Sequence, residues 1–284
     1  MMRLCLRAFF IFTGALLLAG CTGLEKQSKA EYAPEVHTEI TQGYLPADAL
    51  PDSLALLPPP PAEGTAAFAL DEAISRNSLA LQGSPRWKLA AEDADLSFPQ
   101  VAATFSCALG IPISEQDTPC LYRLMRRTFF DARLSTYTAK NRYRRIRPFA
   151  VNGAPTCTPE KEHHMREVGA YPSGHTALGW AWALILSELS PEHADALLER
   201  GWAYGQSRVV CNVHWQSDVT MGRIMGAAAV ARLHADLGFR AAMDAARKEL
   251  EDVRGRRLKP TRGCKAEADA LSQSIPSAPW PANK

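Results

Sequence analysis

Residues 176–189, TALGWAWALILSEL, are apolar on nearly every side of a helix, and only Ser187 and Glu188 interrupt them, late in the run. A helix that is hydrophobic all round is buried. The run is also shorter than the ~18 uncharged residues that a membrane-spanning helix needs. We therefore expect residues 176–189 to form a central helix around which the rest of the chain packs.

Helical signals continue on both sides of this run. Ser190-Pro191-Glu192 provides an N-cap, a first-turn proline and a first-turn acid, so a helix should begin there and end near Gly205. Apolar residues at three-to-four spacing predict further helices over 87–96, 98–109, 119–132, 218–237 and 240–251. Alternating β patterns are scarce. The predicted fold is all-α, a compact helical bundle.

The composition excludes several classes of protein. Hydrophobic residues make up 46% and charged residues 22% of the chain, which is ordinary for a globular protein and excludes disorder and a collagen-like repeat. The net charge is +2, from 32 cationic and 30 acidic residues. A bulk nucleic-acid binder would be far more basic, so we expect no nucleic-acid partner.

Residues 1–20 are predicted to be an export signal. Arg3 and Arg7 form its positive region, and residues 8–20 form its apolar region. The run ends in Leu-Ala-Gly-Cys21, which resembles the lipobox of bacterial lipoproteins, and Thr22 favours the outer membrane in that comparison. We expect a periplasmic protein whose membrane contact is a lipid on Cys21. An ordinary signal with a chance cysteine is the alternative.

Three segments follow the signal. Residues 21–65 are read as a tether and a Pro-rich arm that includes four consecutive prolines at 58–61. Residues 66–254 are expected to form the folded domain. Residues 255–284 contain four prolines among small polar residues, and we expect a loosely ordered tail.

Export places the cysteines in an oxidising compartment. Five remain after Cys5 and Cys21 are set aside, so at least one is unpaired or bonded to another chain. Cys107 and Cys120 flank a short loop, and we pair them. We also pair Cys157 with Cys211 and leave Cys264 without a partner. Neither CxxC nor HxxxH occurs, so no metal site and no cofactor are expected.

A first candidate block is KNRYRRIRP at residues 140–148, with five cations in its first eight positions and no acid. In a chain of nearly neutral charge, this cluster suggests an anionic ligand. A solvated basic face or a patch for a membrane surface is the alternative.

A second block, YPSGHT at residues 171–176, stands just before the central helix. Backbone N–H groups at a helix start suit an anion, and His175 would lie beside it as a proton donor. A capping Ser173 with an incidental histidine is the alternative.

A third block contains Ser207-Arg208 and, five residues later, HWQSD at 214–218. If His214 and Asp218 share a helical turn, their spacing places them on one face, where Asp218 could orient the imidazole. A capping aspartate beside a core histidine is the alternative.

Taken together, the blocks resemble the three-part signature of the superfamily that contains type-2 phosphatidic acid phosphatases, bacterial acid phosphatases and vanadium haloperoxidases. Every signature position is filled here: Lys140, Arg147-Pro148, Pro172 to His175, Ser207-Arg208, His214 and Asp218. The likeness to class A bacterial non-specific acid phosphatases extends over about residues 50–250, including the Pro-rich arm, AAEDAD at 90–95 and LSTY at 134–137. The lipobox and the tail with Cys264 depart from that family.

The resemblance implies a role for each matched residue. His214 would be the nucleophile, Asp218 would orient it, and His175 would be the general acid. The implied phosphate ligands are Lys140, Arg147, Ser173, Gly174 and Arg208, without a metal. Arg142, Arg144 and Arg145 match no signature position, so we expect them to form a basic rim or simply to aid solubility.

The implied activity is hydrolysis of small phosphate monoesters. A vanadate-dependent haloperoxidase or a phosphotransferase using the same residues is the enzymatic alternative. A lipoprotein that binds phosphate-containing ligands without turnover is the non-enzymatic one. The sequence leaves the preferred substrate and the oligomeric state open, a homo-oligomer included.

Overall fold

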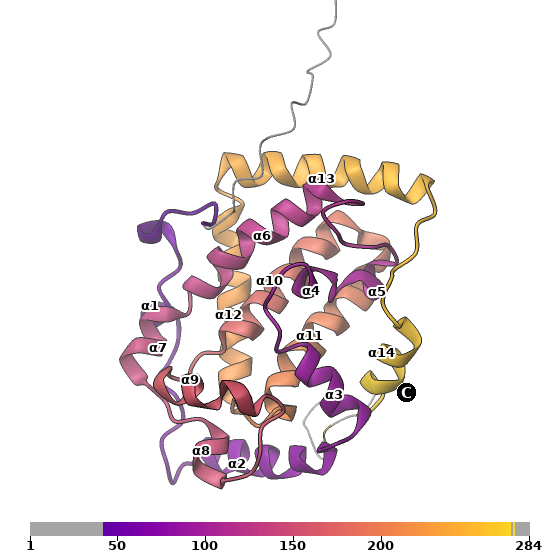
Figure 1. Cartoon of the computed structure of the whole chain (residues 1–284). Helices are drawn as coiled ribbons and strands as arrows, with labels where there is room; N and C mark the ends of the chain where they lie inside the picture. Colours follow the sequence, from indigo (N-terminus) through magenta and orange to yellow (C-terminus); the bar gives the residue numbers. More distant parts are fainter. Residues whose placement is uncertain (1–41, 274, 276–284) are drawn as a thin grey trace, which may run out of the picture. The chain divides into compact units, whose positions relative to one another are not determined.

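The computed structural model describes residues 42–273 and residue 275 (Figure 1). The expected signal peptide and Cys21 lie outside these residues. Every regular element in the described part is helical, which confirms the predicted all-α fold. The longer helices are α2 (Ala66–Ser78), α3 (Pro85–Glu92), α6 (Pro119–Leu134), α10 (Gly174–Leu189), α11 (Ala194–Val210), α12 (Gln216–Leu233), α13 (Leu237–Gly255) and α14 (Cys264–Leu271).

Short helices connect the longer ones. They are α1 (Ser53–Leu56), α4 (Gln100–Ala103), α5 (Ser106–Leu109), α7 (Tyr137–Tyr143), α8 (Pro148–Asn152) and α9 (Glu162–Glu167), with single 3-10 turns at Ala47–Ala49, Leu79–Leu81, Pro159–Lys161 and Pro191–His193. The single helix expected over 98–109 is divided into α4 and α5. Helix α2 was not predicted.

Helix α10 is the central helix that its sequence predicts. It packs against α6, α11 and α12, which surround it in Figure 1. Its Trp182 is fully buried and donates a hydrogen bond from Nε1 to Thr128 Oγ1 of α6 at 3.1 Å. Phe98 and Phe129 pack against the same indole with ring centroids 6.3 and 6.4 Å away. This aromatic core fixes the helix whose first turn carries Ser173 and His175.

Two glycines let α12 approach α10 very closely. A Cβ on Gly222 would lie 2.6 Å from the Ser173 carbonyl oxygen, and one on Gly226 would lie 2.5 Å from that of Ala177. Side chains at these positions would force the helices apart. The close approach places the start of α12 against the start of α10, where the Ser173 N–H donates to the Asp218 carbonyl at 3.0 Å. The second and third blocks of the sequence meet at this point.

The Pro-rich arm lies on the domain and supports the first block. Ser53 Oγ accepts a hydrogen bond from the Ala139 N–H at 2.9 Å and lies 2.7 Å from Thr138 Oγ1, so α1 holds α7 in place. Farther along the arm, the Pro58 carbonyl accepts a bond from the Tyr171 hydroxyl at 2.6 Å. The arm therefore contacts both α7, which carries Lys140, and the loop just before α10, which contains Tyr171.

The C-terminal segment differs from the loosely ordered tail that we expected. Residues 264–271 form α14, which packs on α3, and Glu267 is only 8% exposed. The prolines of the segment suggested a loose tail, but none of them lies within residues 264–271. Burying an unpaired carboxylate is costly. Glu267 forms an ion pair with Arg200 of α11, with Oε1 3.4 Å from Nε.

One predicted disulfide is present and the other is wrong. Cys157 is bonded to Cys211, as expected. Cys107 is bonded to Cys264, 157 residues away, rather than to Cys120. The N–H of Cys120 instead donates to Glu249 Oε1 at 2.9 Å, which ties the start of α6 to α13. Proximity in the sequence suggested the wrong pair, because α14 brings Cys264 to α5.

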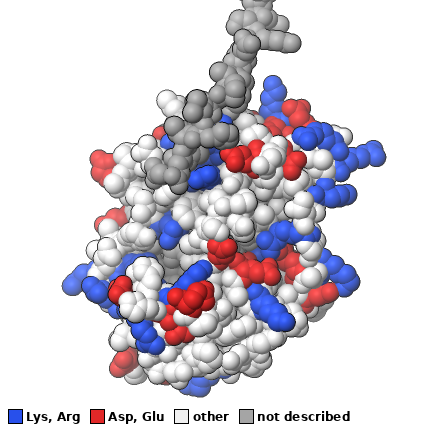
Figure 2. All heavy atoms as spheres, in the orientation of Figure 1, with Lys and Arg blue, Asp and Glu red and all other residues white. Residues whose placement is uncertain are grey.

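None of the described helices combines the length and the apolar character that a bilayer span requires. On the face of the molecule seen in Figure 2, cationic and acidic side chains are interspersed. This mixture agrees with the small net charge of +2. The cations that matter for the site are mostly buried, as described below.

Candidate active site

Lys140 points from α7 into the interior, where it is 5% exposed. Its ammonium group donates hydrogen bonds to the carbonyl oxygens of Gly169 at 2.9 Å and Pro172 at 2.8 Å. Burial, together with the nearby charge of Arg147, lowers the pKa of Lys140 to about 7. The lysine thus joins the first block to the loop before α10. Its buried positive charge is energetically unfavourable without an anion beside it.

Arg147 precedes Pro148, the first residue of α8, and is also buried. Its Nε donates to the Met165 carbonyl and one terminal nitrogen donates to the Val213 carbonyl, at 2.8 and 2.9 Å. The same terminal nitrogen lies 3.1 Å from Nε2 of His214. Burial lowers the pKa of Arg147 to about 10. These backbone contacts aim a fixed guanidinium at the imidazole.

The first turn of α10 supplies the second block. Ser173 is the N-cap, and its Oγ accepts bonds from the Thr176 N–H at 3.3 Å and the Thr176 hydroxyl at 2.9 Å. Because the oxygen accepts both, its own proton is available to donate to a ligand. Gly174 is the first helical residue. Ser173 therefore caps the helix, as the alternative interpretation held, and can also serve as an anion ligand.

His175 is half-buried next in the helix, with Nε2 3.5 Å from the Ala94 carbonyl oxygen. Burial and then the charge of Arg208 hold the pKa of His175 well below its ordinary value. Arg133 and His214 act in the same direction. Burial and the surrounding cations thus disfavour the protonated form of His175, and an anion placed there would favour it.

His214 and Asp218 meet, although not in the way we expected. Helix α12 begins at Gln216, so His214 precedes the helix and Asp218 reaches back to it. Asp218 Oδ2 lies 3.3 Å from His214 Nδ1 and accepts the Trp215 N–H at 2.9 Å. A carboxylate at Nδ1 favours the tautomer with the proton on that nitrogen. The lone pair of Nε2 then faces the cations.

The two members of this pair have opposite pKa shifts. Burial, followed by the charge of Arg147, holds the pKa of His214 well below its ordinary value. Burial raises the pKa of Asp218, while Arg145 and the Trp215 N–H counteract that effect. A neutral imidazole with an oriented lone pair is the form that can attack an electrophile.

Arg208 completes the group of cations. It lies near the end of α11, is 2% exposed, and its Nε has no hydrogen-bond partner among the described residues. Burial lowers its pKa to about 10, with Tyr204 and Asp93 opposing the shift. A buried guanidinium of this kind suits an oxyanion, which accepts two parallel bonds from its fork.

Arg145 is not part of a surface rim, so that expectation was wrong. Its guanidinium lies 2.8 Å from Asp71 of α2 and 2.6 Å from Asp218, and it also donates to Ser217 Oγ at 2.7 Å. The two carboxylates draw the cation inward, away from water. Arg142 and Arg144 do lie at the surface.

Sequence reasoning missed Asp71 entirely. It accepts the Ser217 N–H at 2.8 Å and the Ser217 hydroxyl as well as Arg145. Asp71 stands 146 residues before Ser217, and no motif links the two. The available signal for Arg145 was its place in the first block, two residues before Arg147.

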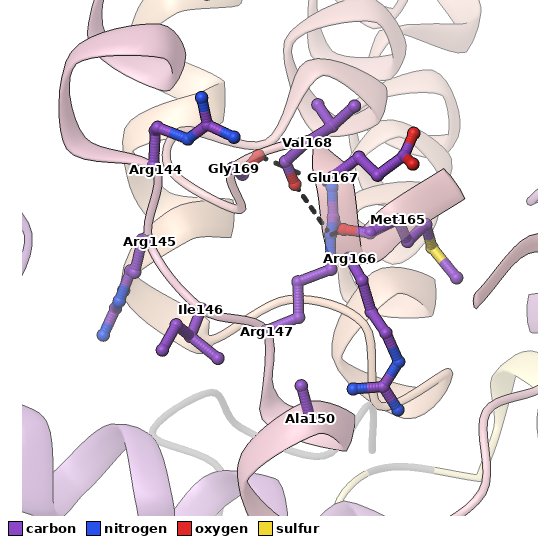
Figure 3. Close-up of a pocket in the computed structure, with 10 residues that line it drawn as sticks. All are labelled: Arg144, Arg145, Ile146, Arg147, Ala150, Met165, Arg166, Glu167, Val168 and Gly169. Carbon is purple, nitrogen blue, oxygen red and sulfur yellow. Dashed lines mark hydrogen bonds between the residues drawn. The ribbon is translucent and has the colours of Figure 1, made fainter. Parts of the chain in front are cut away.

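A small pocket opens beside Arg147 (Figure 3). Its volume is about 190 Å³, and it is lined by Arg144, Arg145, Ile146, Arg147, Ala150, Met165, Arg166, Glu167, Val168 and Gly169. In Figure 3, Arg147 points across it toward the carbonyl groups of Val168 and Gly169. Of the predicted site residues, Arg147 lines this pocket, whereas His175, His214 and Arg208 do not.

No group of three His, Cys, Asp or Glu side chains that could hold a metal ion occurs in the part of the chain that the structure describes. The predicted site residues do converge: three cations, two histidines, one aspartate and the first turn of α10. The arrangement can bind a tetrahedral oxyanion and present a nucleophilic nitrogen to it.

Comparisons with known proteins identify the family of this chain. The PAP2 superfamily matches residues 128–240, which contain all three blocks. A non-specific acid phosphatase of Providencia stuartii is 44% identical over 78% of this chain and 89% of its own length. A non-specific acid phosphatase of Salmonella typhimurium is 42% identical over 75% and 86%, and an acid phosphatase of Zymomonas mobilis is 41% identical over 77% and 83%. The chain therefore belongs to the PAP2 superfamily and, within it, to the class A bacterial non-specific acid phosphatases.

Proposed function

We propose that this acid phosphatase hydrolyses phosphate monoesters through a phosphohistidine on His214, without a metal ion. One observation carries the proposal: the imidazole of His214 is held between Asp218 at 3.3 Å from Nδ1 and Arg147 at 3.1 Å from Nε2. The first contact orients the lone pair of Nε2. The second places a phosphate-binding cation beside it.

Two displacements at phosphorus complete the reaction. In the first, Nε2 of His214 attacks phosphorus, the P–O ester bond breaks, and His175 gives its proton to the leaving alkoxide. In the second, water attacks the phosphohistidine and gives a proton to His175, the P–N bond breaks, and inorganic phosphate leaves. Both histidines then have their starting protonation. An alcohol in place of water would give phosphotransfer by the same steps.

The fixed cations supply the charge that a metal would otherwise provide. Lys140, Arg147 and Arg208 are all less than 10% exposed, so their positions are set before substrate binds. Donors that are already oriented toward developing negative charge stabilise the transition state of phosphoryl transfer. The free hydroxyl proton of Ser173 and the N–H of Gly174 add neutral donors on the α10 side.

The electrostatics of the site favour acidic conditions. Burial lowers the pKa of Lys140 to about 7, so its charged form, which binds phosphate, gains population as the pH falls through neutrality. His175 needs a proton to act as the acid, and burial lowers its pKa in the free protein. A bound phosphate dianion opposes both shifts. We therefore expect a bell-shaped profile of rate against pH on the acidic side of neutral.

We also propose that the protein is exported and anchored through a lipid on Cys21. The disulfides Cys107–Cys264 and Cys157–Cys211 support an oxidising compartment. Mass spectrometry of the mature protein tests this, with acylated Cys21 as the expected N-terminus. An unmodified cysteine, or an N-terminus at another residue, would refute the anchor.

The test of function is phosphate release from an aryl phosphate between about pH 4 and 8 by protein without its signal. Turnover should survive a chelator, fall with vanadate and disappear in His214→Ala, while His164→Ala, a change at an exposed histidine of α9, should keep it. Acid-labile phosphate on the wild-type protein after rapid quenching would identify the phosphohistidine. Folded protein without turnover refutes the proposal, and bromide oxidation after vanadate loading would then indicate a haloperoxidase.

A further inference from the structure

A second buried polar cluster lies behind the catalytic site, between α3, α11 and α14. At its centre, the carboxylate of Asp93 pairs with Arg200 at 2.5 Å and accepts the Ser207 hydroxyl at 2.6 Å. Arg86 donates to the same hydroxyl oxygen at 3.0 Å. All four side chains are less than 5% exposed. The mechanism proposed above uses none of them.

This cluster touches the phosphate-binding residues at two points. Ser207 directly precedes Arg208 on α11, so the bond from Ser207 to Asp93 fixes the turn that carries Arg208. Asp93 is the C-cap of α3, and the next residue, Ala94, presents its carbonyl oxygen to Nε2 of His175 at 3.5 Å. A displacement of Asp93 would therefore disturb both Arg208 and the surroundings of His175.

The C-terminal segment supplies the remaining charge. Glu267 of α14 is 8% exposed, with one carboxylate oxygen 3.4 Å from Arg200 Nε and the other 3.3 Å from Arg262. Without Glu267, Asp93 would be the single carboxylate paired with Arg200 among the described residues. The disulfide between Cys264, the first residue of α14, and Cys107 holds the helix against α5.

We infer that α14 is a positioning element of the active site: Glu267 holds Arg200 and Asp93 in place, and these residues orient the Ser207–Arg208 turn that binds phosphate. The inference rests on the proposed role of Arg208 as a phosphate ligand. Helix α14 lies outside residues 128–240, the part of the chain that the superfamily matches. A segment beyond the superfamily match thereby acts on the site that lies within the match.

Glu267→Gln tests the inference, and Asp269→Asn is the matched control because it lies on the exposed face of the same helix, 64% exposed in its side chain. Calorimetry measures binding of inorganic phosphate, and aryl phosphate kinetics measure KM and kcat. We expect Glu267→Gln to weaken phosphate binding and raise KM by about tenfold or more, because a buried guanidinium loses a charged partner. Asp269→Asn should match the wild type, and Glu267→Asp should restore part of the affinity.

Cys264→Ser gives an independent test, since it releases α14 without changing a charge. It should weaken phosphate binding in the same direction as Glu267→Gln while the helical circular dichroism is retained. Phosphate affinity of Glu267→Gln within twofold of the wild type would overturn the inference. Direct phosphate binding separates this outcome from failure of the proposed reaction, in which the wild type would bind phosphate without turning over substrate.

Discussion

Replacing Arg145 by glutamine should destabilise the protein strongly, because this guanidinium neutralises two buried carboxylates. It contacts Asp71 at 2.8 Å and Asp218 at 2.6 Å, and the side chains of these partners are 3% and 0% exposed. Removing one partner of a buried ion pair costs about 3–5 kcal/mol. At roughly 2–4 °C per kcal/mol for a domain of this size, Tm should fall by about 6–20 °C.

Differential scanning calorimetry near neutral pH measures this loss, and Arg142→Gln is the control. Arg142 lies in the same basic block but is exposed, so its substitution should leave Tm within about 2 °C. Asp71→Asn combined with Arg145→Gln should cost less than the two single changes together, because each removes the same interaction. A loss below about 2 °C in Arg145→Gln would refute the role of this residue as counter-ion.

The same substitution should move the acidic limb of kcat/KM to higher pH. The contacts through the Asp218 carboxylate place the guanidinium within about 8 Å of the imidazole, where a unit charge contributes about 2 kcal/mol at an effective dielectric constant of 20. Burial and then the cations, Arg145 among them, lower the pKa of His214, so loss of the Arg145 charge should raise that pKa. An unchanged limb would contradict this electrostatic coupling.

Three further predictions follow from the burial of the site. Sulfate binding near pH 7.5 should take up a proton, because the anion raises the pKa of Lys140 from about 7. Binding heats in buffers of different ionisation enthalpy measure the uptake, and Lys140→Met should reduce it. The free energy of unfolding should fall as the pH drops below about 6.5, since His175 and His214 bind protons more readily in the unfolded chain. Denaturant titrations at a series of pH values measure this free energy, and its dependence on pH should be weaker in His175→Gln. Gly169→Ala should lower kcat/KM by at least about tenfold, because its Cβ would lie 2.6 Å from the Lys140 carbonyl oxygen. Gly255→Ala should not lower it, because a Cβ there would have nothing within 4 Å. Equal kinetics in the two variants would count against tight packing of Gly169 on Lys140.

The part of the site that could be predicted from sequence is the part encoded locally. The second and third blocks contain their own geometry: Ser173 caps α10, and Asp218 reaches the residues just before its own helix. The all-round apolar character of 176–189 likewise predicts a buried central helix. These features depend on neighbours within a few residues, so spacing and residue type are sufficient to anticipate them.

The missed features all depend on partners far away in the chain. Arg145 looked like a surface cation because its counter-ion Asp71 is 74 residues earlier, on a helix that was not predicted. Cys264 looked unpaired because Cys107 lies 157 residues earlier. A charge or a thiol has no periodicity that reveals its partner. Only the packing of the helices decides which of these groups are buried together.

The distribution of charge in the site makes it complementary to a phosphate dianion. Burial lowers the pKa of Lys140 to about 7 and that of Arg208 to about 10, so these cations are held in surroundings that favour their neutral forms. The carboxylates of Asp71, Asp93 and Asp218 bind other partners, namely Arg145, Arg200 and the His214 ring. A phosphate dianion would supply the missing negative charge. It would thereby restore the pKa of Lys140 and favour protonation of His175, so that in the proposed reaction binding itself would prepare the acid for the first displacement.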